Sequence, residues 1–181
     1  MKMSIECKNE YSASLGEVND QLRLLVGQNC WGVRNKPEES LRLDFGGVMR
    51  RTCSDKECHE TGQDTCVGEF DILVWCAWRL QDSENAICSS DNSDEQYEEA
   101  SKRLIGKKVV SFEISPPAWD ATITFTDNLV LKIFCIYTQD DENETNWFFR
   151  NKLKLYCFNR CDDIEIANIA WDIEGVTCLP S

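Results

Sequence analysis

The chain has 181 residues, of which 42% are hydrophobic, and its formal net charge is −13. This length and composition fit one domain, or two small halves that share a core, and exclude a disordered chain. The negative charge repels phosphate groups, so we expect no binding to nucleic acid and no docking on anionic membranes, whereas a basic protein partner would be attracted.

The chain also lacks segments typical of export or membrane insertion. Its N-terminal stretch has no apolar core of the kind that a secretory signal needs, and no apolar run reaches the length of a membrane span. We therefore expect a cytoplasmic protein. The chain has 11 cysteines, an odd number, and in a reducing compartment most of them should be thiols. Cysteines in apolar runs should pack as small hydrophobic residues.

The first half begins after an N-terminal arm, which we expect over residues 1–16. A helix is predicted over residues 17–26, because apolar residues recur on one helical face and Gly27 suits the C-terminal cap. Apolar and polar residues then alternate as in half-buried strands, which are predicted over residues 30–33, 41–45 and 70–80. Residues 48–68 form a polar insertion that carries cysteines and the single histidine, and we expect a loop there.

An acidic linker, residues 81–96, separates this first half (17–80) from a second half over residues 97–181. Ser93 and Gln96 have the spacing of a capping box, which predicts a helix that runs through Leu104 and is ended by Gly106. More apolar segments follow, predicted to be strands over residues 108–114, 121–125, 129–137 and 153–157, and a strand or short helix over 164–171.

The two halves carry similar short patterns. Leu25-Val26-Gly27 matches Leu104-Ile105-Gly106, and Phe45 corresponds to Phe125 at nearly the same offset along the chain. Trp75-Cys76 matches Phe134-Cys135 at a shorter offset, because the first half carries the extra insertion. The predicted fold is therefore α+β, with two similar halves that share one core, each a short helix followed by an antiparallel β-meander. The alternative is that this order of elements recurs by chance, as it does in α+β proteins.

The insertion holds the sharpest candidate for a metal site. Cys53, Cys58, His59 and Cys66 lie close together in the sequence, and three thiols with one imidazole are a ligand set that structural zinc sites use. All four positions on the metal would be taken by protein, so zinc would staple the loop rather than catalyse a reaction. The alternative is a cysteine-rich loop with no cofactor.

The sequence carries no catalytic signature, and we expect a protein that is not an enzyme. His59 is the only histidine, and the motifs of serine hydrolases, P-loop proteins and dinucleotide-binding proteins are missing. The carboxylates occur in runs that are typical of a solvated surface. A buried pair of aspartates would favour the opposite interpretation, an enzyme that uses clustered carboxylates.

Two stretches resemble a known type of protein. Ser40-Leu41-Arg42-Leu43-Asp44-Phe45-Gly46 and the later run from Phe70 to Leu80, which ends in Trp78-Arg79-Leu80, resemble small uncharacterised bacterial proteins with a strand ending in DFG and a strand ending in WR. Such proteins are similar in size and acidity to the immunity proteins encoded beside polymorphic bacterial toxins. The resemblance implies a binding function, but its motifs are structural, and the Cys/His insertion departs from it.

The leading functional hypothesis is therefore an immunity protein that binds a basic partner, its cognate toxin, and covers the toxin's active site. Acidic side chains would speed association and an aromatic anchor would slow dissociation. The candidate partner-binding residues lie in two acidic segments, and they are Asp140, Asp141, Glu142, Glu144, Trp147, Asp94 and Glu95. The alternatives are a zinc-stapled structural or regulatory module and an enzyme that uses clustered carboxylates.

Overall fold

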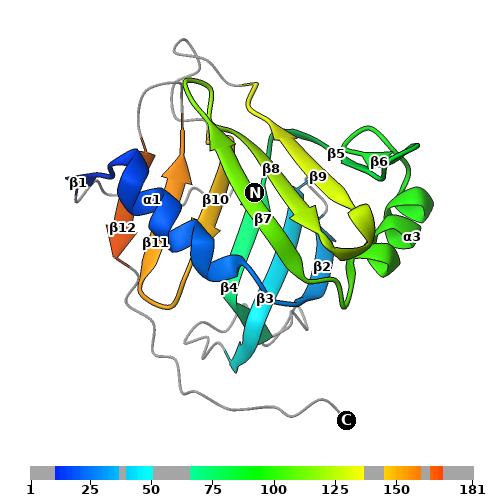
Figure 1. The fold of residues 1–181 in the computed structure, drawn as a ribbon, viewed down its shortest axis with the longest axis horizontal. Helices are drawn as coiled ribbons and strands as arrows, with labels where there is room; N and C mark the ends of the chain where they lie inside the picture. The colour runs from blue at the N-terminus through cyan, green and yellow to red at the C-terminus, as the bar shows by residue number, and fades with distance from the viewer. Residues whose placement is uncertain (1–10, 37–39, 51–65, 137–144, 160–163, 169–181) are drawn as a thin grey trace.

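The computed structural model of the chain describes residues 11–36, 40–50, 66–136, 145–159 and 164–168 (Figure 1). Over these residues the fold is α+β, with two antiparallel sheets and two α-helices, as predicted at the level of fold class. Neither helix in this part of the chain has the length and apolar composition needed to cross a bilayer.

The elements follow one another along the chain with short connections. The first part contains β1 (Tyr11–Ser12), α1 (Leu15–Leu22), the 3-10 turn η1 (Arg23–Leu25), β2 (Cys30–Lys36), β3 (Ser40–Arg50), β4 (Cys66–Val74), β5 (Ala77–Gln81) and β6 (Ala86–Ser89). The second part contains α3 (Asp94–Leu104), β7 (Val109–Ser115), β8 (Asp120–Phe125), η2 (Thr126–Asn128), β9 (Val130–Phe134), β10 (Trp147–Arg150), β11 (Lys154–Phe158) and β12 (Ile164–Asn168).

The two sheets exchange strands. The larger sheet has the order β1-β12-β11-β10-β4-β3-β2, and the smaller has the order β6-β5-β9-β8-β7. The chain therefore leaves the larger sheet between β4 and β5, and it leaves the smaller sheet between β9 and β10. The segment 70–80, predicted to be one strand, is for this reason two strands in different sheets, separated at Trp75 and Cys76.

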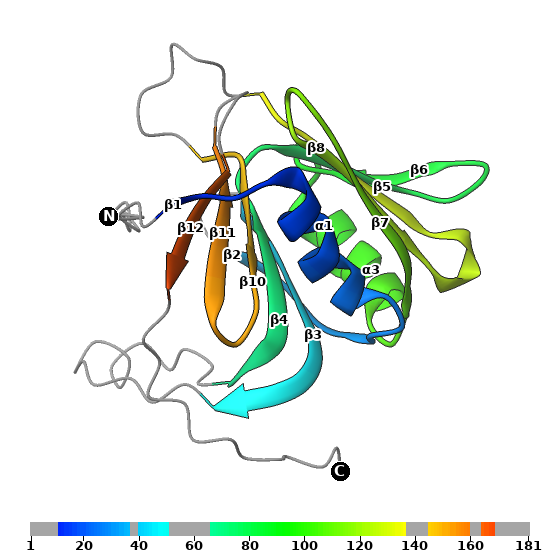
Figure 2. The ribbon, with the colours of Figure 1, turned by 60° about the vertical axis from the view of Figure 1, so that its left-hand side comes forward.

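Each helix lies against an edge strand. Helix α1 contacts β7, the edge of the smaller sheet, and α3 contacts β2, the edge of the larger sheet. Figure 1 places α1 and α3 on opposite sides of the molecule, and Figure 2 shows both of them in the space between the two sheets. A helix packed along an edge strand shields main-chain groups that would otherwise pair with another chain.

The core lies between the facing sheets. On β3, the side chains of Leu41, Leu43 and Phe45 point inward, as their alternation predicts. The Phe45 ring stacks on Phe125 of the other sheet with a centroid separation of 6.4 Å. This aromatic contact joins the two residues that the sequence pattern made equivalent in the two halves.

The segments that follow the two helices are joined by reciprocal main-chain hydrogen bonds. Each bond has a counterpart in which both residues are replaced by their equivalents in the other half, at the offset that relates Gly27 to Gly106. The bonds run from Gly27 N to Val109 O (2.8 Å), Gly106 N to Cys30 O (2.7 Å), Cys30 N to Lys107 O (2.8 Å) and Val109 N to Gln28 O (3.0 Å). Gly27 and Gly106 both have positive φ, at 85° and 84°, so both helices end in the same left-handed turn.

The predicted pattern of helix and meander is nevertheless imperfect. Strand β1 lies in the predicted N-terminal arm, where Tyr11 pairs with Ile166 of β12, and β6 lies in the predicted acidic linker. Strands β1 and β12 have no equivalents in the smaller sheet. The segment predicted as a strand or short helix, 164–171, is a strand as far as the structure describes it.

The cysteines in the described part of the chain are mostly thiols, in line with the sequence. Those with free thiols are Cys30, Cys66, Cys76, Cys88 and Cys135. Burial is the main cause that raises the pKa of the Cys30 thiol well above its ordinary value. Cys157 is the exception, because it is disulfide-bonded.

Candidate binding site at the start of helix α3

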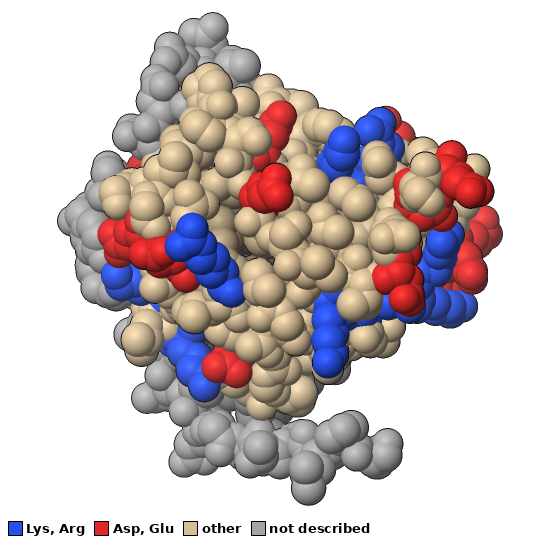
Figure 3. All heavy atoms as spheres, in the orientation of Figure 1, with Lys and Arg blue, Asp and Glu red and all other residues tan. Residues whose placement is uncertain are grey.

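A solvent-facing hollow of about 400 Å³ lies where β6 leads into α3. Two aromatic rings and a set of short polar side chains line it: Trp78, Ser89, Ser90, Asp91, Asn92, Asp94 and Tyr97. In Figure 3, carboxylates gather with some Lys and Arg at the right of the view, over α3 and β6, while the middle of the face carries few charges. The lining contains two carboxylates and no cation.

Local hydrogen bonds hold the turn that forms one wall of this hollow. The Asn92 side chain accepts the Ser89 N–H at 2.7 Å and donates to Gln96 Oε1 at 3.0 Å. Ser93 and Gln96 form the capping box that the sequence predicts, which fixes where α3 begins. The turn and the first helical turn are therefore one rigid unit.

The aromatic residues come from two elements that are separated in the sequence. Trp78 of β5 and Tyr97 of α3 meet edge to face, with ring centroids 5.8 Å apart and an interplanar angle of 78°. Trp78 is 5% exposed and Tyr97 is 9% exposed. Two of their polar atoms, Trp78 Nε1 and Tyr97 Oη, are buried without a hydrogen-bond partner of ordinary geometry in the described part of the chain.

The environment of Tyr97 keeps its phenol protonated. Burial raises the pKa of Tyr97 above its ordinary value, and the nearby Ser101 hydroxyl opposes that shift. A neutral phenol beside a neutral indole leaves Asp91 and Asp94 as the charged groups of the hollow. The arrangement is therefore suited to a cation, which would meet carboxylates at the rim and aromatic rings on the wall.

The sequence predicted part of this site. Asp94 lines the hollow, and Glu95 lies beside it in the first turn of α3, on the exposed surface. Sequence reasoning missed Trp78 and Tyr97, because an aromatic residue on a strand or helix is most often a core residue. The capping box was the one available signal, since it located the turn that brings these rings together.

Trp147 was wrongly predicted to be a surface anchor. It is 0% exposed, its ring stacks on Phe158 at 3.6 Å, and its indole N–H donates to the Trp119 carbonyl at 3.0 Å. The acidic residues predicted to act with it, Asp140, Asp141, Glu142 and Glu144, lie outside the described residues.

The predicted zinc ligands fall mostly outside the described residues as well, which is the case for Cys53, Cys58 and His59. Cys66 begins β4 and carries a free thiol. Among the residues that the structure describes, no group of three or more metal-ligating side chains comes together.

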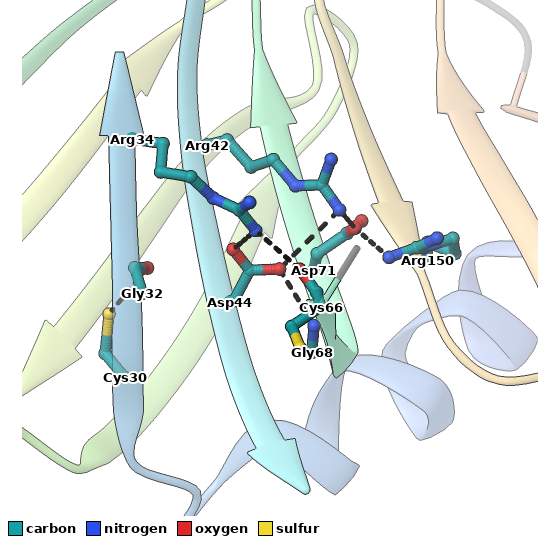
Figure 4. Close-up of polar contacts among 9 residues, drawn as sticks. All are labelled: Cys30, Gly32, Arg34, Arg42, Asp44, Cys66, Gly68, Asp71 and Arg150. Carbon is teal, nitrogen blue, oxygen red and sulfur yellow. Dashed lines mark hydrogen bonds and ion pairs between the residues drawn. The ribbon is translucent and has the colours of Figure 1, made fainter. Parts of the chain in front are cut away.

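A second cluster of charges lies on the face of the larger sheet that points away from the core (Figure 4). Asp44 of β3 and Asp71 of β4 are cross-strand partners, and both are buried. Like charges in this position repel, so cations must lie between and beside them. Arg42 Nη2 does so, at 2.5 Å from Asp71 Oδ2 and 3.6 Å from Asp44 Oδ1.

Two further arginines complete the cluster. Arg34 pairs with Asp44, and Arg150 pairs with Asp71. Asp44 also accepts the Gly68 N–H at 2.9 Å, and a Cβ on Gly32 would come within 3.0 Å of its carboxylate, so glycine is required on the facing strand. Burial raises the pKa of the Asp71 carboxyl, and the neighbouring Arg150 and Arg42 oppose the shift.

This cluster bears on the enzyme hypothesis, which called for two close, buried carboxylates. The pair exists, but three guanidinium groups hold its oxygens. Carboxylates engaged in this way are poor proton acceptors and poor nucleophiles, because a reaction would first have to break a buried ion pair. The cluster therefore fits a structural role in tying β2, β3, β4 and β10 together.

Comparison of the chain with protein-family models, with curated proteins and with solved structures finds no match. The geometry of the described residues is therefore the basis for the functional proposal.

Proposed function

We propose that this protein is a cytoplasmic binding protein that neutralises a basic protein partner, in the manner of an immunity protein that covers the active site of its cognate toxin. The observation that carries this proposal is the hollow beside α3, where Asp91 and Asp94 stand over Trp78 and Tyr97. A lysine or arginine side chain of the partner would enter the hollow. The function needs no catalytic residue on this chain.

The charges near the hollow support a cationic occupant. The cations closest along α3 are already paired on the surface: Lys102 with Glu98 at 3.0 Å and Arg103 with Asp82 at 3.1 Å. Asp91 and Asp94 have no ion pair in the described part of the chain, which leaves them available to a partner. The net charge of −13 would steer a basic protein toward the surface before this contact forms.

The aromatic rings would add residence time. A guanidinium or ammonium group beside an indole is attracted to the ring face, and desolvation inside a hollow strengthens that attraction. The unpartnered Trp78 Nε1 offers a hydrogen-bond donor to a main-chain carbonyl of the partner. The rigid turn at residues 89–93 would be preorganised for binding, so little ordering entropy would be lost.

A capture experiment at two salt concentrations tests this function. The immobilised full chain is incubated with lysate of its source at low salt, and bound proteins are identified after elution with high salt. We expect a basic protein that the wild type retains and that an Asp91→Asn/Asp94→Asn variant does not. Equal retention by both proteins would contradict a role for the hollow. The matched control is Glu113→Gln on β7, an exposed carboxylate at the opposite edge of the same sheet.

We also propose the finer fold prediction, that the chain consists of two similar halves, residues 17–80 and 97–181. The reciprocal hydrogen bonds between Gly27 and Val109 and between Gly106 and Cys30 support it, as does the strand exchange in which each half adds two strands to the sheet of the other. Both meanders also break their register at the same point, after Cys30 and after Val109.

A further inference from the structure

The two places where the chain crosses between sheets bring two cysteines to neighbouring positions. Strands β5 and β9 are antiparallel, and Ala77 lies opposite Phe134 at the end of their ladder. The next residue outward on each strand is Cys76 and Cys135. Antiparallel partners have Cα atoms about 4.5–5.5 Å apart, which lies within the range that a disulfide spans.

Buried polar contacts hold the backbone on both sides of this pair. The Asn146 carbonyl accepts from Trp75 N at 2.9 Å and from Cys76 N at 3.1 Å. The side chain of the same asparagine accepts from Ile136 N at 3.0 Å. The Cys135 N–H donates to Asp120 Oδ1 at 2.8 Å. Neither crossover can therefore move away from the other without breaking hydrogen bonds.

The two thiols also interact with each other. Both are free. The pKa of Cys135 is raised, first because its thiol shares a hydrogen bond with Cys76 and then because of burial. Cys76 is 3% exposed, whereas Cys135 is partly exposed and is followed by Ile136, which is 54% exposed. A thiol reagent from solution would therefore reach Cys135 first.

We propose that Cys76 and Cys135 form a redox modification site, which a small disulfide oxidant such as oxidised glutathione closes to a cross-strand disulfide. In the first step the Cys135 thiolate attacks one sulfur of the oxidant. One glutathione leaves and takes the proton that Cys135 gave up. In the second step Cys76 attacks the Cys135 sulfur of the mixed disulfide and releases the second glutathione. Two protein thiols are oxidised, and one glutathione disulfide is reduced to two thiols.

The link would join the two crossovers, which connect β4 to β5 and β9 to β10. It would therefore tie together the segments through which the two sheets exchange strands. The attacking species is the thiolate, and the raised pKa of Cys135 makes it scarce near neutral pH, so the reaction should quicken as the pH rises. The oxidised protein should unfold at a higher temperature than the reduced protein.

The test uses the full chain, oxidised glutathione and mildly alkaline pH, followed by proteolysis without reductant and mass spectrometry. We expect a disulfide-linked pair of peptides that contain Cys76 and Cys135. In a Cys76→Ser variant, one glutathione should instead remain on Cys135, because the second step has no thiol. A Cys88→Ser control, at a buried cysteine of β6, should still form the link.

Two results would overturn the proposal. The first is wild-type protein in which Cys135 carries glutathione and no link to Cys76 forms. The second is wild-type protein in which neither thiol reacts while the chain stays folded, as judged by its circular dichroism spectrum. Both results are read on the wild type, so the test does not depend on whether a variant folds.

Discussion

The buried charge cluster allows a prediction with a definite magnitude. Asp71 is 6% exposed and accepts ion pairs from Arg42 and Arg150, whose side chains are 13% and 8% exposed. An Asp71→Asn substitution keeps the shape of the side chain and removes its charge. Arg150 then loses the carboxylate that neutralises it, and Arg42 retains only the more distant Asp44 oxygen, at 3.6 Å.

The expected cost follows from leaving a buried cation without its partner. Breaking one side of a buried ion pair costs about 3–5 kcal/mol. Burial already raises the pKa of Asp71 and so weakens its charged form, which favours the lower end, about 3 kcal/mol. The matched control is Asp127→Asn. Its partner is Lys107 and its side chain is 69% exposed, so we expect a loss of only about 0–1 kcal/mol.

Urea unfolding followed by tryptophan fluorescence measures both losses, and the slope of the free energy against urea concentration should stay constant. A double variant, Asp71→Leu with Arg150→Met, removes both charges and should recover much of the loss, because an apolar pair of similar volume can replace a buried ion pair. The reasoning fails if Asp71→Asn costs no more than Asp127→Asn.

Three further predictions concern the turns, the thiols and the salt dependence. Gly27→Ala and Gly106→Ala should destabilise the chain equally, by about 1 kcal/mol each, because both positions have positive φ and no atom near an added Cβ; unequal losses in urea unfolding would argue against similar halves. The pKa of Cys30 is raised in the folded protein, so its contribution to stability is complete below the thiol's ordinary pKa of 9.0 and is lost as the pH rises above it. The free energy of unfolding should then fall by up to about 1.4 kcal/mol per pH unit for this thiol, and a Cys30→Ala variant should show a shallower slope. The association rate with the captured partner should fall steeply with ionic strength, and a rate that salt does not change would argue against electrostatic steering.

The sequence predicts those features that depend on neighbouring residues. Ser93 and Gln96 contact each other within one turn, so the start of α3 follows from their spacing alone. The ends of both helices follow in the same way from Gly27 and Gly106, since few residues other than glycine accept positive φ. The alternation of Leu41, Leu43 and Phe45 likewise predicts which face of β3 is buried.

The features that the sequence does not predict depend on contacts between distant residues. The run through Trp75 and Cys76 reads as one apolar strand, because the crossing from one sheet to the other leaves no local signal. The pattern of β3 predicts that Asp44 is exposed, but arginines from β2 and β3 reach its carboxylate. Trp78 meets Tyr97 only because β5 and α3 pack together, so the hollow could not be predicted from either residue.

The measurement that tests the proposed function most directly is the affinity of the captured basic partner, purified, for the wild-type chain and for the Asp91→Asn/Asp94→Asn variant at low salt. If a partner cation enters the hollow, the variant should bind about tenfold to a hundredfold more weakly, which corresponds to roughly 1.4–2.8 kcal/mol. The Glu113→Gln control should bind like the wild type. Equal affinities of the double variant and the wild type would show that the partner binds elsewhere and would contradict the assignment of this site.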